Sequence, residues 1–328
     1  MNSENLRASF SLRMRLYTEA VQLRDIRGWG YKRVSRWLTD SYKFRVPRST
    51  VHSWLRGRQS PIGNRNVFES RPSYALSYVI GAVMGDGSVY HSELHHNDEV
   101  KLAVVDRDFA EAFAECLSMI FPSHSSFSAS LRRDDACPRY VVRVGSGLLA
   151  DFLSQPLEKL NDAIRPHSAA FLRGLFDAEG SAVVGKSNGR LSIRVELTNN
   201  ELTILQYVQH LLHEFEIDSQ IGQYDRHPVV TRFIRGKRAS FATPTFWLAI
   251  RKQRSLCKFQ DAVSFGISRK RRKLDIALDL IHRFGTRAAA NEWLRIYTKH
   301  GPRWVERENT QKPRRGLVVQ LVNTPPSH

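Results

Sequence analysis

The feature that most constrains the fold of this chain is a short segment that occurs twice. Residues 78–87 read YVIGAVMGDG and residues 171–180 read FLRGLFDAEG, so each copy runs from apolar residues into an acid followed by glycine. The apolar spacing predicts a short helix in each copy, which the glycine ends. Small residues recur four positions apart, so the two helices can approach backbone to backbone; they are Gly81 with Gly85 and Gly174 with Ala178.

The acid at the end of each predicted helix, Asp86 or Glu179, is electrostatically unfavourable. A carboxylate in the last turn faces the negative end of the helix dipole, which costs about 0.3–1 kcal/mol per site. If the helices pack side by side, the two acids also repel each other. Divalent cations held between the helix ends would offset both costs, and such ions can polarise a phosphate and activate a water. Asp86 and Glu179 are therefore the candidate catalytic and metal-binding residues.

The same order of predicted elements follows both copies of the segment. A strand, a helix, a strand and a helix are expected at 100–105, 109–120, 140–144 and 148–153, and again at 191–197, 202–215, 246–250 and 256–263. Further strand signals lie at 127–132 and 218–224. The chain is therefore expected to fold as two related halves around the paired helices.

Over residues 74 to about 265 this pattern resembles the LAGLIDADG homing endonucleases in their single-chain form, although Met84 replaces the family's first acid. The resemblance implies an α+β fold of two pseudo-symmetric αββαββα halves, whose saddle-shaped antiparallel sheets face the DNA major groove. It places the catalytic acids on Asp86 and Glu179, with two or three Mg²⁺ ions that Mn²⁺ can replace. The implied activity is hydrolysis of both strands of duplex DNA by a monomer.

Basic side chains near the acids would complete such a site. By register with the family, Arg143 and Lys252 are the candidate supporting catalytic residues, with Arg251 as an alternative to Lys252. Lys101, Arg194 and Arg251 are expected to contact DNA, and Lys186 remains a further possibility. For each of these side chains, the simpler alternative to a supporting role in catalysis is a phosphate contact or a solvated surface position.

The positive charge of the chain is concentrated in its two flanks. The net charge is +18, with 14 basic and 5 acidic residues in both 1–70 and 268–328, whereas the centre is formally neutral. Flanks of this kind are typical of arms that anchor a protein on a polyanion such as DNA. The sequence shows no lipidation motif and no basic amphipathic stretch that favours a membrane surface instead.

The N-terminal flank predicts three short helices. Apolar residues recur at helical spacing and pause at residues 28–30, and a third helix follows Pro47, with Ser49 as its expected cap and Gly57 as its end. The segment resembles the helix-turn-helix modules of transposases and resolvases, which implies a recognition helix in the DNA major groove. The candidate DNA-binding residues are Arg48, Thr50, His52, Ser53 and Arg56. The alternative is a three-helix packing unit with a solvated basic face.

The C-terminal flank begins with five consecutive basic residues at 269–273. A helical stripe then runs from Leu274 to Gly285, and a second helix, capped by Thr286 and carrying Tyr297, is expected to end at Gly301. These helices are expected to pack on the body or lie along flanking DNA, with a loose tail from Lys312 onward.

Other motifs in the sequence point away from competing chemistries. Residues 180–187 satisfy the phosphate-loop pattern, but a helix precedes them and Asn188-Gly189 predicts a hairpin turn, so no nucleotide triphosphate is expected to bind. Three histidines, His91, His95 and His96, lack a second cluster at zinc-ligand spacing and are expected to be loop residues. Three separated cysteines exclude a disulfide framework. No signal peptide or transmembrane segment is predicted, so a cytoplasmic, nucleoid-associated protein is expected.

The predicted domains are a helix-turn-helix with its linker (1–66), a first half (67–168), a second half (169–267) and a basic extension (268–328). The favoured function is a site-specific, intron-associated homing endonuclease. An intron RNA maturase is an alternative on the same fold, as is a transcription regulator that binds DNA without cutting it. The retention of both acids disfavours the regulator, and the helix-turn-helix favours DNA over RNA as the partner.

Overall fold

The computed structural model describes residues 10–58, 66–91, 98–122, 126–133, 138–224, 229–234, 237–242, 244–301 and 303–307. His95, His96, Cys137, the linker around Pro61 and Gly63, and the tail from Lys312 lie outside these ranges. Of the other cysteines, Cys116 is buried and Cys257 is exposed, and both are free. In the described part of the chain, no helix combines the length and apolarity needed to span a membrane.

The N-terminal segment forms the three expected helices, α1 (Phe10–Arg27), α2 (Tyr31–Tyr42) and α3 (Arg48–Leu55). Their core is the predicted apolar set, in which Leu16, Ala20, Leu23, Val34, Leu38, Val51 and Trp54 are buried together with Val46. The expected capping by Ser49 is wrong. The N-cap is Pro47, two residues earlier than expected, and helix α3 begins at Arg48 without a side-chain cap, since the fixed φ of proline suits this position. Gly57, with φ of +65°, ends the helix as predicted.

The first half of the body contains helix α4 (Tyr74–Gly85) followed by an antiparallel sheet. Its strands are β1 (Gly87–Tyr90), β2 (Glu99–Val104), β3 (Ser130–Arg132) and β4 (Arg139–Gly145), in the order β1-β2-β4-β3. Helix α5 (Arg107–Ile120) crosses between the two hairpins, and α6 (Gly147–Leu153) follows the sheet. Helix α7 (Leu157–Ile164) and a short 3₁₀ turn (Arg165–His167), which the sequence analysis did not anticipate, lead into the second half.

The second half repeats this topology. Helix α8 (Ser168–Glu179) precedes β5 (Gly180–Ser187), β6 (Arg190–Asn199), β7 (Gln220–Gln223) and β10 (Phe246–Ile250), in the order β5-β6-β10-β7. Helix α9 (Leu202–Glu214) crosses between the hairpins and α10 (Gln253–Ala262) follows the sheet. The matching strand orders confirm the predicted α+β fold of two pseudo-symmetric halves. A separate two-stranded ribbon, β8 (Val229–Ile234) with β9 (Lys237–Ala242), is inserted between β7 and β10.

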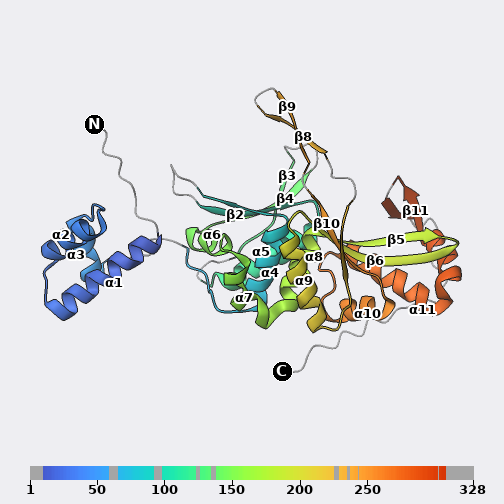
Figure 1. The fold of residues 1–328 in the computed structure, drawn as a ribbon, viewed down its shortest axis with the longest axis horizontal. Helices are drawn as coiled ribbons and strands as arrows, with labels where there is room; N and C mark the ends of the chain where they lie inside the picture. Colours follow the sequence, from blue (N-terminus) through green and yellow to red (C-terminus); the bar gives the residue numbers. More distant parts are fainter. Residues whose placement is uncertain are drawn as a thin grey trace.

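The paired helices α4 and α8 lie at the centre of the body, and the sheets cover one side of them (Figure 1). Strand β2 alternates in burial, so Val100, Leu102 and Val104 pack on the helices while the residues between them face outward. One continuous hydrophobic core spans both halves and includes α4, α8 and both sheets. The contact between the halves is therefore part of the core of the protein.

The segment that matches the phosphate-loop pattern is a strand. Residues 180–187 form β5, which pairs with β6 through a turn at Asn188 and Gly189. Both turn residues have positive φ, of 50° and 71°, as a two-residue turn of the primed type requires. The segment therefore lacks the helix N-terminus on which phosphate binding by such a loop depends.

The C-terminal extension differs in part from its prediction. Helix α11 (Ser268–Ile296) is broken at Gly285, whose φ of 66° is non-helical, as the sequence indicated. The expected continuation of the second helix through Tyr297 is wrong. Tyr297 begins β11 (Tyr297–His300), which pairs with β12 (Arg303–Glu306) through the turn at Gly301. The Trp304 indole N–H donates to the Val184 carbonyl of β5 at 2.8 Å, so the hairpin is tied to the second sheet.

Candidate active site

The paired helices meet at the glycines that the sequence singled out. A Cβ atom added to Gly81 would lie 2.1 Å from the Phe171 carbonyl oxygen, and one added to Gly174 would lie 2.4 Å from the Tyr78 carbonyl oxygen. In each case the obstructing carbonyl belongs to the residue three positions before the facing glycine. The predicted backbone-to-backbone approach is therefore present, and the contact is pseudo-symmetric.

The same contact continues to the helix ends and brings the two acids to one place. A Cβ atom on Gly85 would lie 2.3 Å from the Ala178 Cβ and 3.2 Å from the Glu179 Cγ. Asp86 follows Gly85 directly as the C-cap of α4, and its N–H donates to the Ala82 carbonyl at 3.1 Å. Glu179 is the last residue of α8. The acids thus flank the final contact between the helices.

The electrostatic cost expected for these acids is evident from their surroundings. Asp86 retains solvent-exposed surface and Glu179 is partly buried, yet removal of water from both carboxyls raises their pKa. The charge of Asp86 raises the pKa of Glu179 further. The positive charge of Lys270 opposes both shifts.

The sequence analysis missed the role of Lys270. This side chain is 8% exposed, and its ammonium donates to the carbonyls of Phe176 (3.2 Å), Asp177 (2.5 Å) and Ala178 (3.4 Å) at the end of α8. Burial lowers the pKa of Lys270 to about 8, partly countered by the charge of Asp177. A signal was present, because five basic residues at a helix start oppose the helix dipole and require compensation.

Asp177, the first acid of the second motif, is buried and structural in its contacts. It accepts hydrogen bonds from the Tyr78 hydroxyl at 2.9 Å and from the backbone N–H groups of Gly266 at 2.8 Å and Ile267 at 3.1 Å. Burial nevertheless raises the pKa of Asp177. The carboxylate thereby joins α4, α8 and the start of α11, whereas Met84 occupies the equivalent position in the first motif.

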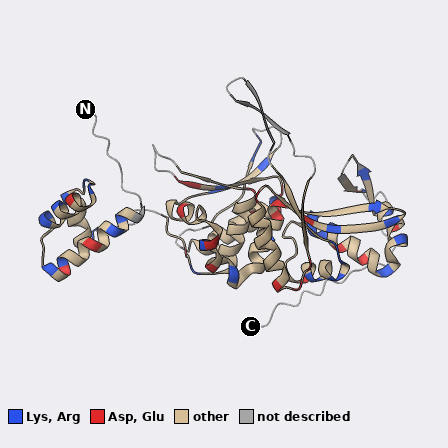
Figure 2. Ribbon diagram, in the orientation of Figure 1, with Lys and Arg blue, Asp and Glu red and all other residues tan. Residues whose placement is uncertain are grey.

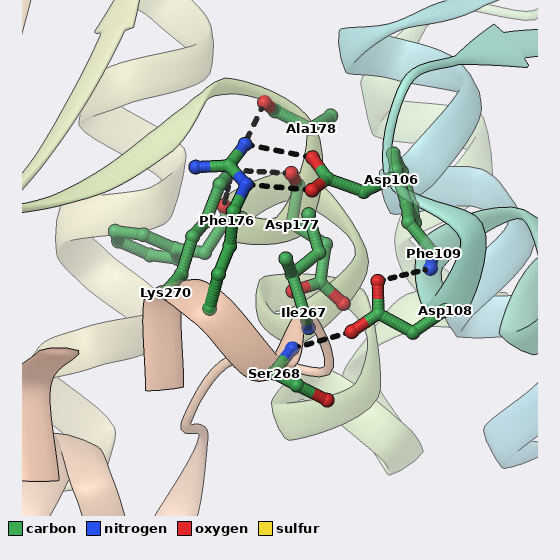
Figure 3. Close-up of polar contacts among 10 residues, drawn as sticks. Asp106, Asp108, Phe109, Phe176, Asp177, Ala178, Ile267, Ser268 and Lys270 are labelled. Carbon is green, nitrogen blue, oxygen red and sulfur yellow. Dashed lines mark hydrogen bonds and ion pairs between the residues drawn. The ribbon is translucent and has the colours of Figure 1, made fainter. Parts of the chain in front are cut away.

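Acids of the first half hold the start of α11 from the other side (Figure 3). Asp106 forms two hydrogen bonds with the Arg269 guanidinium, at 2.6 and 2.7 Å, and Asp108 accepts from the Ser268 N–H at 2.5 Å. A cavity of about 360 Å³ lies beside this junction. Its polar lining comes from Asp86, Asp106, Arg139, Asp177, Arg269 and Lys270.

The predicted supporting residues lie on the surface with other partners. Arg143 is 3.8 Å from Glu99, and Lys252 is 3.0 Å from Asp218, with side-chain exposures of 47% and 72%. Neither cation acts on the pKa of Asp86 or Glu179. In the first half, Arg139 is the β4 cation that lines the same cavity as Asp86.

The predicted DNA-contacting residues of the sheets lie on the sheet faces that point away from the paired helices. Lys101 lies opposite Arg143 in the register of β2 and β4, away from the buried strand positions. In the second half, Arg194 pairs with Glu196 at 2.5 Å and the Arg251 guanidinium lies over the Trp247 ring at 5.0 Å. Figure 2 shows Lys and Arg along β5 and β6 and over α11. The outer faces therefore carry positive charge, partly compensated by neighbouring acids.

The residues predicted to bind DNA on α3 differ in exposure. Arg48 and Arg56 are exposed, whereas Thr50, His52 and Ser53 are partly buried. The His52 ring meets the Tyr31 ring edge to face, with centroids 4.8 Å apart. The two arginines are thus the most accessible of the five side chains.

The donor set at the helix ends fits a partly hydrated divalent ion. Within the described ranges, no group of three or more His, Cys, Asp or Glu residues forms a cage for a metal. Mg²⁺ binds through one or two carboxylates and keeps several waters, with substrate phosphate supplying further oxygens. Asp86 and Glu179 supply two hard oxygen donors of this kind. His91, by contrast, contacts Ser154 at 3.0 Å and lies near Asp98 and Asp151.

Comparison with known proteins confirms the family resemblance. Residues 166–264, in the second half, match the model of the LAGLIDADG-like domain family. Two uncharacterized proteins of Methanocaldococcus jannaschii are similar to the chain. One is 27% identical over 253 residues, covering 76% of this chain and 89% of the relative, and the other is 27% identical over 165 residues, covering 49% and 61%.

Several solved structures are similar to the chain at low identity. The homing endonuclease I-DmoI in complex with DNA and Ca is 18% identical with a TM-score of 0.44, covering 63% of this chain and 99% of I-DmoI. I-WcaI bound to its DNA recognition sequence is 13% identical (TM-score 0.38; 63% and 88% covered). The N-terminal LAGLIDADG domain of DUF199/WhiA is 17% identical (TM-score 0.37; 66% and 88% covered).

Proposed function

We propose that this chain is a site-specific DNA endonuclease of the LAGLIDADG type. It hydrolyses phosphodiester bonds on both strands of a duplex with the help of bound Mg²⁺, and it acts as a monomer through its two unequal halves. The observation that carries the proposal is the pair of acids, Asp86 and Glu179, held at the adjacent ends of two helices by a close glycine contact.

In this mechanism Asp86 and Glu179 would hold the divalent ions, with one acid serving each strand. The bound ions would supply charge relief at the phosphate and a water of lowered pKa. The carboxylates must be ionised to bind them, and Lys270 favours the ionised form of both. The body of the protein contributes orientation, since the helix contact fixes where the acids lie relative to the outer faces of the sheets.

Basic side chains of the N-terminal flank and of the two sheets would supply the affinity for DNA. Basic side chains on the sheets and on helix α3 meet the phosphate backbone, and the helix-turn-helix anchors the enzyme beside its target. The proposed DNA contacts are Arg48, Thr50, His52, Ser53, Arg56, Lys101, Arg194 and Arg251, with Arg143 and Lys252 as supporting cations near the cut.

The test is cleavage of a plasmid library of candidate sites by the full chain, with Mg²⁺ or with Ca²⁺. The wild type is expected to linearise its target with Mg²⁺. Asp86→Asn and Glu179→Gln should bind the same DNA without making a double-strand break. Matched controls are Asp162→Asn and Glu158→Gln, which change exposed acids of α7 in the same way and should cut normally.

Each result has a clear meaning. Double-strand cutting by Asp86→Asn or Glu179→Gln would remove that residue from the mechanism. DNA binding without cutting by the wild type, whatever the divalent ion, would favour the regulator. Stimulated splicing of a host intron transcript without DNA cleavage would favour the maturase.

A further inference from the structure

The start of α11 is the point at which both halves and the C-terminal extension are joined. Three segment ends converge there: the C-terminus of α8, the N-terminus of α5 and the N-terminus of α11 itself (Figure 3). The α8 carbonyls that Lys270 contacts lie just before Glu179 in the chain, although Lys270 itself is about ninety positions away. This arrangement is distinct from the outward-facing cations that the sequence proposed for catalysis.

Lys270 binds carbonyls at the C-terminal end of α8. The last carbonyls of a helix have no intrahelical donor, and a cation at this end also meets the negative pole of the helix dipole. The ammonium lies within 3.4 Å of the carbonyls of Phe176, Asp177 and Ala178. The Phe176 carbonyl also accepts from the Gly180 N–H, and the other two lie beyond this last helical hydrogen bond. Because the buried Lys270 side chain binds carbonyls in the last turn of α8, it restrains the backbone that carries Glu179.

The cost of this contact is offset by acids of both halves. An ammonium in the first turn of α11 faces the positive pole of its own helix and lies next to Arg269. Asp106 pairs with Arg269, Asp108 accepts from the Ser268 N–H, and Asp177 accepts from two N–H groups just before the helix. The buried lysine is therefore retained by acids from both halves.

We propose that Lys270 is a positioning residue for Glu179: it holds the last turn of α8 in place and sets a fixed positive charge behind the paired acids. This inference rests on the proposed nuclease function. The hydrogen bonds of Lys270 restrain the backbone of the second motif, since the carbonyls that it contacts belong to α8. The charge of Lys270 acts on both acids, so only Glu179 receives the restraint as well as the charge.

A consequence of this asymmetry is that the two strands of the target should respond differently to loss of Lys270. Replacement of a residue that orients a metal ligand typically changes metal affinity or activity by about 10- to 100-fold. The effect should be larger on the strand that depends on Glu179, because only this acid loses a backbone restraint in addition to the charge. General destabilisation of the protein would instead slow both strands together.

The test compares Lys270→Met and Lys270→Gln with Lys159→Met, which removes an exposed lysine of α7 as a matched control. Lys270→Gln keeps an N–H donor for the carbonyls without the charge, so it provides a second variant should Lys270→Met fold poorly. Two measurements are made on full-length protein: strand-resolved cleavage rates, and Mn²⁺ affinity by calorimetry in the presence of target DNA that carries non-cleavable linkages at the scissile positions.

We expect both Lys270 variants to bind Mn²⁺ about 10-fold more weakly or worse, and to shift the ratio of the two strand rates in the direction that Glu179→Gln does. Unchanged Mn²⁺ affinity in a folded variant, or an equal slowing of both strands, would overturn the positioning role while leaving the nuclease in place. A wild type that neither cuts DNA nor binds Mn²⁺ would reject the proposed function itself, and the inference with it.

Discussion

Replacing Gly81 with alanine tests the helix contact on which the site depends. The added Cβ would lie 2.1 Å from the Phe171 carbonyl oxygen and 2.9 Å from the Leu175 nitrogen, and both are backbone atoms that cannot rotate away. The helices would have to separate locally by at least about 0.9 Å to reach the 3.0 Å limit for real Cβ contacts. Overpacking of this kind costs about 1–3 kcal/mol or more, whereas alanine regains about 0.8–1.0 kcal/mol of helix propensity.

Because the 2.1 Å approach lies far below the limit, the cost falls at the upper end of its range, about 3 kcal/mol, and the expected net result is a loss of about 2 kcal/mol in the free energy of unfolding. Urea unfolding of Gly81→Ala measures it, and Mn²⁺ binding should weaken in parallel because the acids lie at the ends of the separated helices. Gly145→Ala is the matched control, since its new Cβ would come no closer than 3.9 Å to the Asp98 carbonyl oxygen. A Gly81→Ala protein as stable as the wild type, with unchanged Mn²⁺ affinity, would refute both the tight contact and its role in placing the acids.

Three further predictions concern charge. Burial raises the pKa of Asp86 and Glu179 in the folded state, so the stability that these acids contribute is full below the ordinary carboxyl range and is lost as pH rises through the raised pKa values. Asp86→Asn should therefore stabilise the metal-free protein at neutral pH by up to about 1 kcal/mol. A lower melting temperature for this variant would contradict the prediction. As pH is lowered, the Mn²⁺ affinity should begin to fall at a higher pH than it would for a site of exposed carboxylates. Calorimetry that finds the decline only near the ordinary carboxyl pKa, about 4, would count against this prediction. Deleting residues 1–66 should weaken DNA binding and reduce its salt dependence more than it slows cutting; an equal affinity at every salt concentration would reject the anchoring role.

The fold of the body could be predicted because its signals are local and occur twice. The apolar periods of α5 and α9 and the strands β6 and β10 identify each half, and the repeated motif indicates how the halves meet. Helix α7 lacked a comparable partner in the second half and was missed. Tyr297 was predicted to be helical because it lies four positions after Trp293. In the structure Tyr297 belongs to a strand, and its ring stacks on the Trp293 ring with the centroids 4.0 Å apart. Local spacing does not distinguish these two geometries.

The acids of the site could be predicted, whereas their surroundings could not. Asp86 and Glu179 were identifiable because each lies in the last turn of a predicted helix, where the helix dipole disfavours a carboxylate and no neighbouring residue in the sequence offsets that cost. Lys270 belongs to a basic run that is usually solvated, and only the tertiary fold places it against α8. From the sequence, the offsetting charge was expected from metal ions alone, but Lys270 supplies part of it for both acids.

The divergence between Met84 and Asp177 bears on how this chain can be rebuilt. Each half contributes one glycine-containing helix to a nearly symmetric contact, which suggests a simplified protein built as a homodimer from two copies of one half. Two first halves would lack the carboxylate that receives the backbone before α11, and two second halves would lack Asp106 and Asp108 to balance Arg269 and Lys270. The duplicated parts have become complementary, and neither can substitute for the other.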